Sequence, residues 1–199
     1  MPEANDEFST ILAVLTGLGL AAACGFRVFL PLFVASLAAR SGYLRLQEDF
    51  AWLGSSFAMI CFGAATLIEI GGFLLPFLDN LLDVIATPAA AIAGAVVSLA
   101  VFVDLDPGLR WTLALVAGAG LATAVQVPTA AARGGSSALT GGIANWGLAV
   151  GELFASSLLA LLSLLAPIAV PVVLIALIFV VIRLARRRKN PPGSLSSRA

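Results

Sequence analysis

The stretch GLGLAAACGFRVFLP at residues 17–31 decides how this sequence folds. It lies in an apolar run over residues 8–39 whose only charged residue is Arg27. A charged side chain at the centre of a bilayer costs roughly 2.5–3.5 kcal/mol on insertion scales. Arg27 therefore requires a partner, a water-filled cavity or an interface, and the rest of the chain has to provide it.

The composition is typical of an all-α membrane protein. Of 199 residues, 60% are hydrophobic and 11% are charged, and the mean hydropathy is +1.06. Soluble domains contain about 25% charged residues. We therefore expect a single helical membrane domain at residues 1–186, followed by a basic and disordered tail at residues 187–199.

The same composition argues against an enzyme. The chain has no histidine, the commonest metal ligand and general base. Its two cysteines, Cys24 and Cys61, lie inside predicted spans, so a stabilising extracellular disulfide is not expected. The glycine-rich stretch at residue 17 has no preceding strand and no Lys-Ser/Thr, which excludes a phosphate loop. We expect no catalytic site, metal or cofactor.

About six transmembrane helices are predicted, because crossing a bilayer takes roughly 20 apolar residues. The predicted spans are residues 8–31, 51–75, 84–103, 109–132, 143–165 and 167–184. The first contains two possible break points, Gly25 and Pro31. Either it ends near Pro31 and a short helix follows, which we favour, or two half-helices form a re-entrant hairpin. Residues 133–142 are predicted to form a flexible loop.

The two halves of the chain, residues 8–104 and 109–186, resemble each other. GLGLAAA at 17–23 shares five of seven residues with GAGLATA at 118–124. A glutamate precedes a proline by 19 residues in both halves, at Glu69 and Pro88 and at Glu152 and Pro171. Because three spans per half is an odd number, the second copy would be inverted. Such 3+3 inverted repeats occur in many transporters, with a site near the midplane.

The basic end of the chain predicts the topology. The last apolar segment is followed by Arg186, Arg187, Arg188 and Lys189. Such a cluster marks the cytoplasmic side, and six spans would place both chain ends there. The cluster could also attract anionic lipid at about 1 kcal/mol per residue. A nucleic-acid partner is not expected, because the cluster is short and lacks aromatic residues; a homo-oligomer is possible.

The polar residues of the predicted spans are the candidate site. Glu69 is the leading partner for Arg27, because it is the only deeply placed acid in the next span, and Asp79 and Asp83 are the alternatives. Glu152 is expected to lie near Arg133 or Asn145. The candidate substrate or ion path consists of Arg27, Glu69, Asn145 and Glu152, with a secondary polar cluster of Asp79, Asn80 and Asp83.

Small residues in the first and fourth spans predict close contacts between helices. The glycines expected to pack in this way are Gly17, Gly19, Gly118 and Gly120, while Gly25 and Pro31 are the expected helix breaks.

Three segments, residues 25–44, 68–97 and 131–162, also resemble a known family. The residues that match its pattern are Gly25, Arg27, Glu69, Pro76, Asp79, Asp83, Pro88, Asn145 and Glu152. Over roughly residues 10–182 the chain is similar to an uncharacterised bacterial integral-membrane family catalogued as domain of unknown function four-one-two-six. The resemblance implies a multi-pass helical protein of the bacterial inner membrane and no particular activity.

Two functions are compatible with these features. The first is a small-solute or ion transporter or channel that uses buried Arg and Glu side chains, since charges inside a membrane mark functional sites by default. The alternative is a non-catalytic membrane scaffold or lipid-interacting protein, which would rest on the basic tail and on the lack of an enzyme motif.

Overall fold

The computed structural model describes the backbone of residues 2–73 and 76–189, with the side chains of residues 7–72, 83–179 and 182–183. Helix accounts for 87% of the structure, and no strand occurs in the described backbone, so the all-α class is confirmed. The elements are α1 (Pro2–Cys24), α2 (Phe29–Arg40), η1 (Glu48–Gly54), α3 (Ser56–Phe73), α4 (Pro76–Val101), α5 (Pro107–Leu113), the π-helix η2 (Ala114–Gly118), α6 (Ala119–Thr140), α7 (Asn145–Leu165), η3 (Pro167–Ala169) and α8 (Val170–Lys189).

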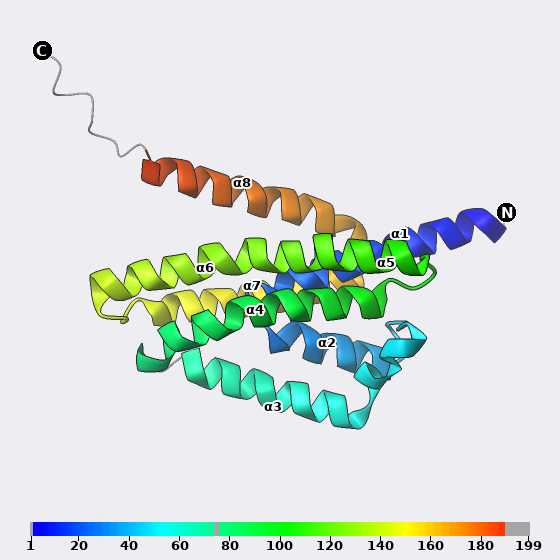
Figure 1. Cartoon of the computed structure of the whole chain (residues 1–199), viewed down its shortest axis with the longest axis horizontal. Coiled ribbons are helices and arrows are strands. Elements are labelled where there is room, and N and C mark those ends of the chain that lie inside the picture. The colour runs from blue at the N-terminus through cyan, green and yellow to red at the C-terminus, as the bar shows by residue number, and fades with distance from the viewer. Residues whose placement is uncertain (1, 74–75, 190–199) are drawn as a thin grey trace, which may run out of the picture.

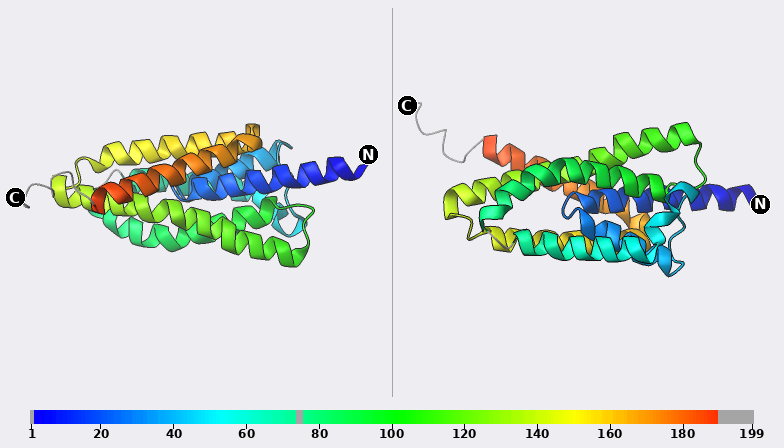
Figure 2. Two further views of the ribbon diagram at one scale, coloured as in Figure 1. Left: turned by 90° about the horizontal axis from the view of Figure 1, so that it is seen from above. Right: turned by 60° about the horizontal axis from the view of Figure 1, so that its bottom comes forward.

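The long helices lie along the longest dimension of the molecule (Figure 1). Helix α1 enters the bundle from one end and α2 turns back, so that the two form a hairpin (Figures 1 and 2). The start of α1 and the end of α8 therefore lie at opposite ends of the molecule. The prediction that both chain ends share one side is not confirmed, because the α1–α2 hairpin reverses the chain once more than six simple spans do.

The turn of the hairpin lies at residues 25–28, between the end of α1 and the start of α2. A Cβ on Gly25 would collide with the carbonyl oxygen of Ala122 and with Val125, so this position requires glycine. The predicted break at Gly25 is confirmed. Pro31 does not break a helix: it lies in the first turn of α2, where a missing N–H is tolerated. The first span therefore ends at Cys24 and not near residue 31; a short helix follows it, as favoured from the sequence, and this helix turns back against the span.

Four helical segments of the described chain are long and apolar enough to cross a membrane. They are Glu7–Cys24, Asp83–Val101, Pro107–Thr140 and Asn145–Leu165. A bent pair, Glu48–Gly54 with Ser56–Gly72 at 61°, raises the number to five, and Phe29–Arg40 and Pro167–Phe179 are shorter apolar helices. The described residues thus form a multi-pass helical protein, but six spans are not confirmed.

The predicted loop at residues 133–142 is wrong, because α6 continues to Thr140. Each glycine inside a helix costs about 1 kcal/mol relative to alanine, which is why Gly134 and Gly135 suggested a loop. Buried ion pairs of Arg133 hold this part of the helix in place. Gly141 then ends α6 in the left-handed conformation, with φ of 62°, which is a common helix terminus.

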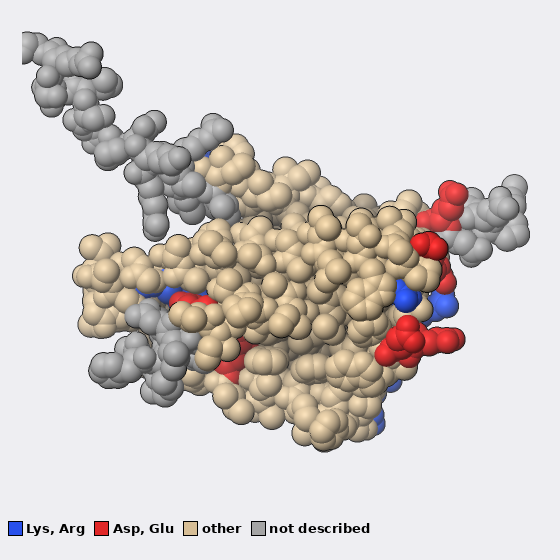
Figure 3. Space-filling model, viewed as in Figure 1, with Lys and Arg blue, Asp and Glu red and all other residues tan. Residues whose placement is uncertain are grey.

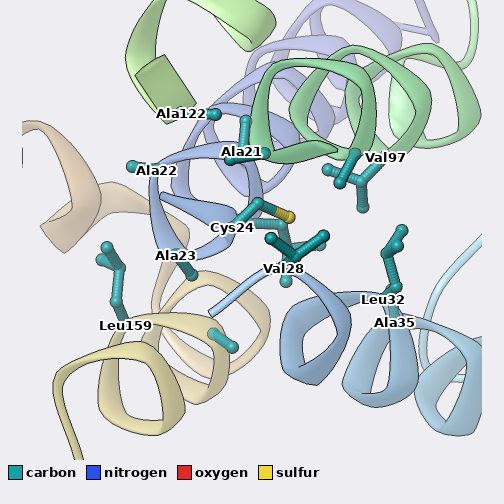
Figure 4. Packing of buried hydrophobic residues seen from close by; sticks show 14 of the residues in the cluster. Ala21, Ala22, Ala23, Cys24, Val28, Leu32, Ala35, Val97, Ala122 and Leu159 are labelled. Carbon is teal, nitrogen blue, oxygen red and sulfur yellow. The ribbon is translucent and has the colours of Figure 1, made fainter. Parts of the chain in front are cut away.

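The core is built largely from small side chains of α1. Figure 4 shows Ala21, Ala22 and Ala23 facing Ala122 of α6 and Leu159 of α7, and all five residues are buried. The small volume of alanine lets the helix backbones approach closely, as in other membrane bundles. Helix α1 is thus the central helix, in contact with α4, α6 and α7.

Three of the four predicted packing glycines lie at close contacts. An added Cβ would collide with a neighbouring side chain at Gly17 (Phe102), Gly19 (Ser163) and Gly118 (Ser98). Gly120 differs, because no heavy atom lies within 4 Å of the position of its missing Cβ. Close packing therefore does not explain Gly120.

The two segments that suggested a repeat run in the same direction. Helix α1 and helix α6 both lead away from the end of the molecule where the chain begins (Figure 1). An inverted copy of α1 would run the opposite way. The inverted repeat is therefore not confirmed, even though the GLGLAAA and GAGLATA stretches are alike in sequence.

Charged and apolar side chains are separated on the surface. Figure 3 shows charged residues gathered at the end where α1 begins, and a mostly uncharged surface along the bundle that is interrupted by small charged patches toward the other end. Large apolar side chains are exposed on several helices, for example Ile68 at 75% and Val172 at 69%. Such a surface suits contact with the apolar interior of a bilayer.

Candidate functional site

Arg27 lies in the α1–α2 turn and is 2% exposed. Its Nη2 donates a hydrogen bond to the carbonyl oxygen of Ala149 at 2.8 Å and lies 3.7 Å from Oε2 of Glu152. Both partners belong to α7. The predicted requirement for a buried partner is confirmed, although the carboxylate that meets it belongs to Glu152 and not to Glu69.

Glu69 of α3 has a different role from the one predicted. Its carboxylate accepts hydrogen bonds from the backbone N–H groups of Val28 (2.7 Å) and Phe29 (3.1 Å). These are donors at the start of α2 that have no partner within the helix, and a negative charge at a helix N-terminus is favourable. Glu69 therefore fixes the position of α2, and with it the position of the turn that carries Arg27.

Arg133 of α6 is the centre of a second set of ion pairs. It is fully buried, and its Nη2 lies 3.0 Å from Oδ1 of Asp83 on α4. Its Nε lies 3.3 Å from Oε1 of Glu152, which confirms the predicted proximity of Arg133 and Glu152. Glu152 thus bridges the two arginines, Arg27 and Arg133, with its two carboxylate oxygens.

These residues form one cluster of buried charges. Glu69 adds an electrostatic attraction to both Arg27 and Arg133, without an ion pair within 4.0 Å to any described residue. We call the group the ion cluster; its members are Arg27, Glu69, Asp83, Arg133 and Glu152. Among the side chains that the structure describes, three carboxylates face two guanidinium groups, so the ion cluster contains one more acid than base.

Asn145 lies at the start of α7, two helical turns before Glu152, and is 2% exposed. Its Nδ2 donates a hydrogen bond to Oγ of Ser137 on α6 at 2.7 Å. Residues seven apart share a helix face, so Asn145 and Glu152 lie along the same side of α7. Polar groups therefore extend from the ion cluster toward the end of the bundle where α6 joins α7.

Of the predicted secondary polar cluster, the structure describes the side chain of Asp83 alone. The side chains of Asp79 and Asn80 lie outside the described residues, as do those of Arg186, Arg187, Arg188 and Lys189 and the whole of residues 190–199. Asp83 is described, and it belongs to the ion cluster through Arg133. Among the described residues there is no group of three His, Cys, Asp or Glu that could hold a metal ion.

Two contributions of α6 were missed by sequence reasoning. The first is the ion pair of Arg133 with Asp83, and the second is Gln126, which is 1% exposed and whose Nε2 has no hydrogen-bond partner among the described residues. Gln126 and Arg133 are seven residues apart and therefore share a face. The seven-residue spacing could have predicted a shared polar face, but residue 133 was assigned to a loop and not to the helix that contains Gln126.

Helix α7 is attached to the same turn by a third contact. Oγ of Ser156 donates a hydrogen bond to the carbonyl oxygen of Ala23 at 3.0 Å. The same carbonyl accepts hydrogen bonds from the backbone N–H groups of Phe26 (3.1 Å) and Arg27 (3.2 Å), so Ser156 adds an interhelical bond at the point where the turn closes on α1. Arg27, Glu152 and Ser156 together hold α7 against the turn.

An all-α bundle with an apolar surface and an internal ion cluster is a multi-pass helical membrane protein. One family matches residues 14–187 of the chain, and its description is Domain of unknown function (DUF4126). The chain belongs to this family, which confirms the resemblance found in the sequence. No curated protein and no solved structure matches the chain.

Proposed function

We propose that this protein is a small-solute or ion transporter or channel, and that the ion cluster forms part of the path. The supporting observation is that Glu152 bridges two buried arginines, 3.7 Å from Arg27 and 3.3 Å from Arg133, inside an apolar bundle. Charges inside a membrane are expensive, and they commonly line solute paths or proton relays.

The position of the ion cluster supports the same proposal. Arg27 lies in the turn of a helix hairpin, and irregular backbone at membrane depth is tolerated where it is buried in protein or lines a cavity. Discontinuous helices frame the substrate sites of many transporters. The polar residues Ser137 and Asn145 continue from the cluster toward one end of the bundle and would line an entrance there.

Several finer features belong to this proposal and remain predictions. They are six spans, residence in the bacterial inner membrane, a cytoplasmic C-terminus, anionic lipid at Arg186–Lys189 and a homo-oligomer. The absence of enzymatic activity also belongs here. The opposite placement of the start of α1 and the end of α8 would put the N-terminus outside if the basic tail is cytoplasmic.

Flux across proteoliposomes tests the proposal. Wild-type protein should carry potassium, chloride or protons faster than empty liposomes, as read by ion-sensitive dyes. Arg27→Ala and Glu152→Gln should each reduce that flux at least tenfold, while circular dichroism and gel filtration show a folded protein. Asp49→Asn is the matched control, because Asp49 pairs with Arg110 outside the ion cluster.

The outcome separates the two functions. Normal flux in both folded variants, or no flux of any of these ions in wild type, would rule out this use of the ion cluster. The scaffold or lipid-interacting alternative instead expects deletion of residues 186–199 to reduce binding to vesicles that contain anionic lipid. Undiminished binding after the deletion would leave the basic residues as a topology signal.

A further inference from the structure

A cavity of about 220 Å³ lies beside the α1–α2 turn, between the start of α2 and helices α3 and α4. Its floor contains Val28, Glu69 and Ala86, which are buried. Glu69 is the only ionisable residue among the described residues that line it, and the other walls are aliphatic or aromatic. The cavity thus combines an apolar enclosure with a single carboxylate.

The mouth of this cavity faces sideways from the bundle. Ile68 on α3 and Ile85 on α4 line it and are 75% and 57% exposed. Apolar side chains with this exposure contact lipid chains when the bundle is in a membrane. A ligand would therefore reach the floor from within the bilayer, and not along the polar residues at the α6–α7 end.

Glu69 retains capacity for a ligand. A carboxylate offers about four acceptor sites, and the N–H groups of Val28 and Phe29 occupy two of them. Glu69 forms no ion pair within 4.0 Å with a described residue, although Arg27 and Arg133 attract it from farther away. Because the ion cluster contains one more acid than base, a cation at this position would balance its charge.

We propose that this cavity binds an apolar cation, an ammonium group on a small hydrophobic body, with the charge placed beside Glu69. The apolar walls would bind the body by dispersion and by burial of its surface. A neutral chain could fill the same walls but would gain nothing from the carboxylate. This inference goes beyond the proposed function, because it concerns binding and holds whether or not anything is transported.

Binding of benzyltrimethylammonium to the full-length protein in lipid nanodiscs tests the inference, with empty nanodiscs as the blank. Its neutral carbon isostere, neopentylbenzene, has nearly the same shape. Wild-type protein should bind the cation at least tenfold more tightly than the isostere. Glu69→Gln should weaken binding of the cation roughly 10- to 100-fold, because it removes the negative charge beside the ammonium group, and should leave the isostere unchanged.

A second variant keeps the test decisive if Glu69→Gln does not fold. Ala65→Phe places a large ring in the cavity and should abolish binding of both compounds while the carboxylate remains. Ala124→Phe is the matched control: it adds the same ring to a separate apolar groove between α6 and α8 and should change neither affinity.

Three results would overturn the inference. They are equal affinity of wild type for the cation and the isostere, full cation binding by folded Glu69→Gln, and full binding of both compounds by folded Ala65→Phe. None of them depends on flux. Loss of flux with intact cation binding would contradict the proposed function alone.

Discussion

Two regions of the molecule place a buried arginine beside a carboxylate, in different surroundings. In the ion cluster, Arg27 lies 3.7 Å from Glu152, and their side chains are 2% and 8% exposed. At the other end, Arg110 also lies 3.7 Å from its partner, Asp49, but the Asp49 side chain is 75% exposed. The distances are equal, so the two pairs differ in the solvent access of the acid and in the second arginine, Arg133, that lies 3.3 Å from Glu152.

This difference determines what each pair contributes. An ion pair with an exposed member is worth about 0–1 kcal/mol, because water solvates the charge in either state. Removal of one member of a buried pair costs about 3–5 kcal/mol, because the remaining charge stays in a low-dielectric interior. Distance alone therefore does not rank ion pairs in this protein.

The largest effect is expected for Glu152→Ala. This change removes a carboxylate that lies beside both Arg27 and Arg133, so the free energy of unfolding should fall by about 3–5 kcal/mol. Reversible unfolding in mixed detergent and SDS measures it. Glu152→Gln, which keeps hydrogen-bonding atoms, should lose less. A loss below 1 kcal/mol for Glu152→Ala would mean that water or neighbouring acids already solvate the two arginines.

A smaller loss is expected for Gly25→Ala in the hairpin turn. The added Cβ would collide with the Ala122 carbonyl and with Val125, and overpacking of this kind costs about 1–3 kcal/mol. Gly120→Ala is the matched control in open space, and it should stabilise the helix by up to about 1 kcal/mol. Equal effects of the two substitutions in the same unfolding assay would contradict the close approach at the turn.

Asp49→Asn should change stability by no more than about 1 kcal/mol, because the Asp49 side chain is mostly in solvent. The same unfolding assay measures it. A loss of unfolding free energy as large as that of Glu152→Ala would show that exposure of the acid does not determine how much an ion pair stabilises this protein.

The smallest effect is expected from salt. The Debye length falls from about 10 Å at 0.1 M to about 3 Å at 1 M, so the difference between wild type and Asp49→Asn should vanish at the higher concentration. The loss in Glu152→Ala should persist, because its surroundings exclude ions. Unfolding of all three proteins at both concentrations gives the comparison, and equal salt sensitivity would indicate that the ion cluster is open to water.

The fold was predictable where the signal is local. Apolar runs and the low charge content identified a helical membrane protein, and Gly25 identified a break, because helix length and transfer free energy depend on nearby residues. The extension of α6 to Thr140 was not predictable from the glycines at 134 and 135. It depends on Arg133, whose partners lie on other helices.

The sequence predicted which residues belong to the candidate site better than it predicted which of them contact each other. Arg27, Glu69 and Glu152 were identified as buried or costly, and all three belong to the ion cluster. Proximity in sequence favoured Glu69 as the partner of Arg27, but Glu69 accepts hydrogen bonds from the start of α2. The first N–H groups of α2 have no partner within the helix, so they compete with Arg27 for the Glu69 carboxylate.

The sequence by itself determined that GLGLAAACGFRVFLP belongs to an apolar membrane segment with a break at Gly25, and that Arg27 needs a partner, because the free-energy cost of burying a charge depends on the residue itself. Only the tertiary structure decided what meets that need. The hairpin turns α2 back along the bundle, and α7 brings the Ala149 carbonyl, 122 residues away, to 2.8 Å from the guanidinium group. Such contacts depend on how whole helices pack, which no local pattern specifies.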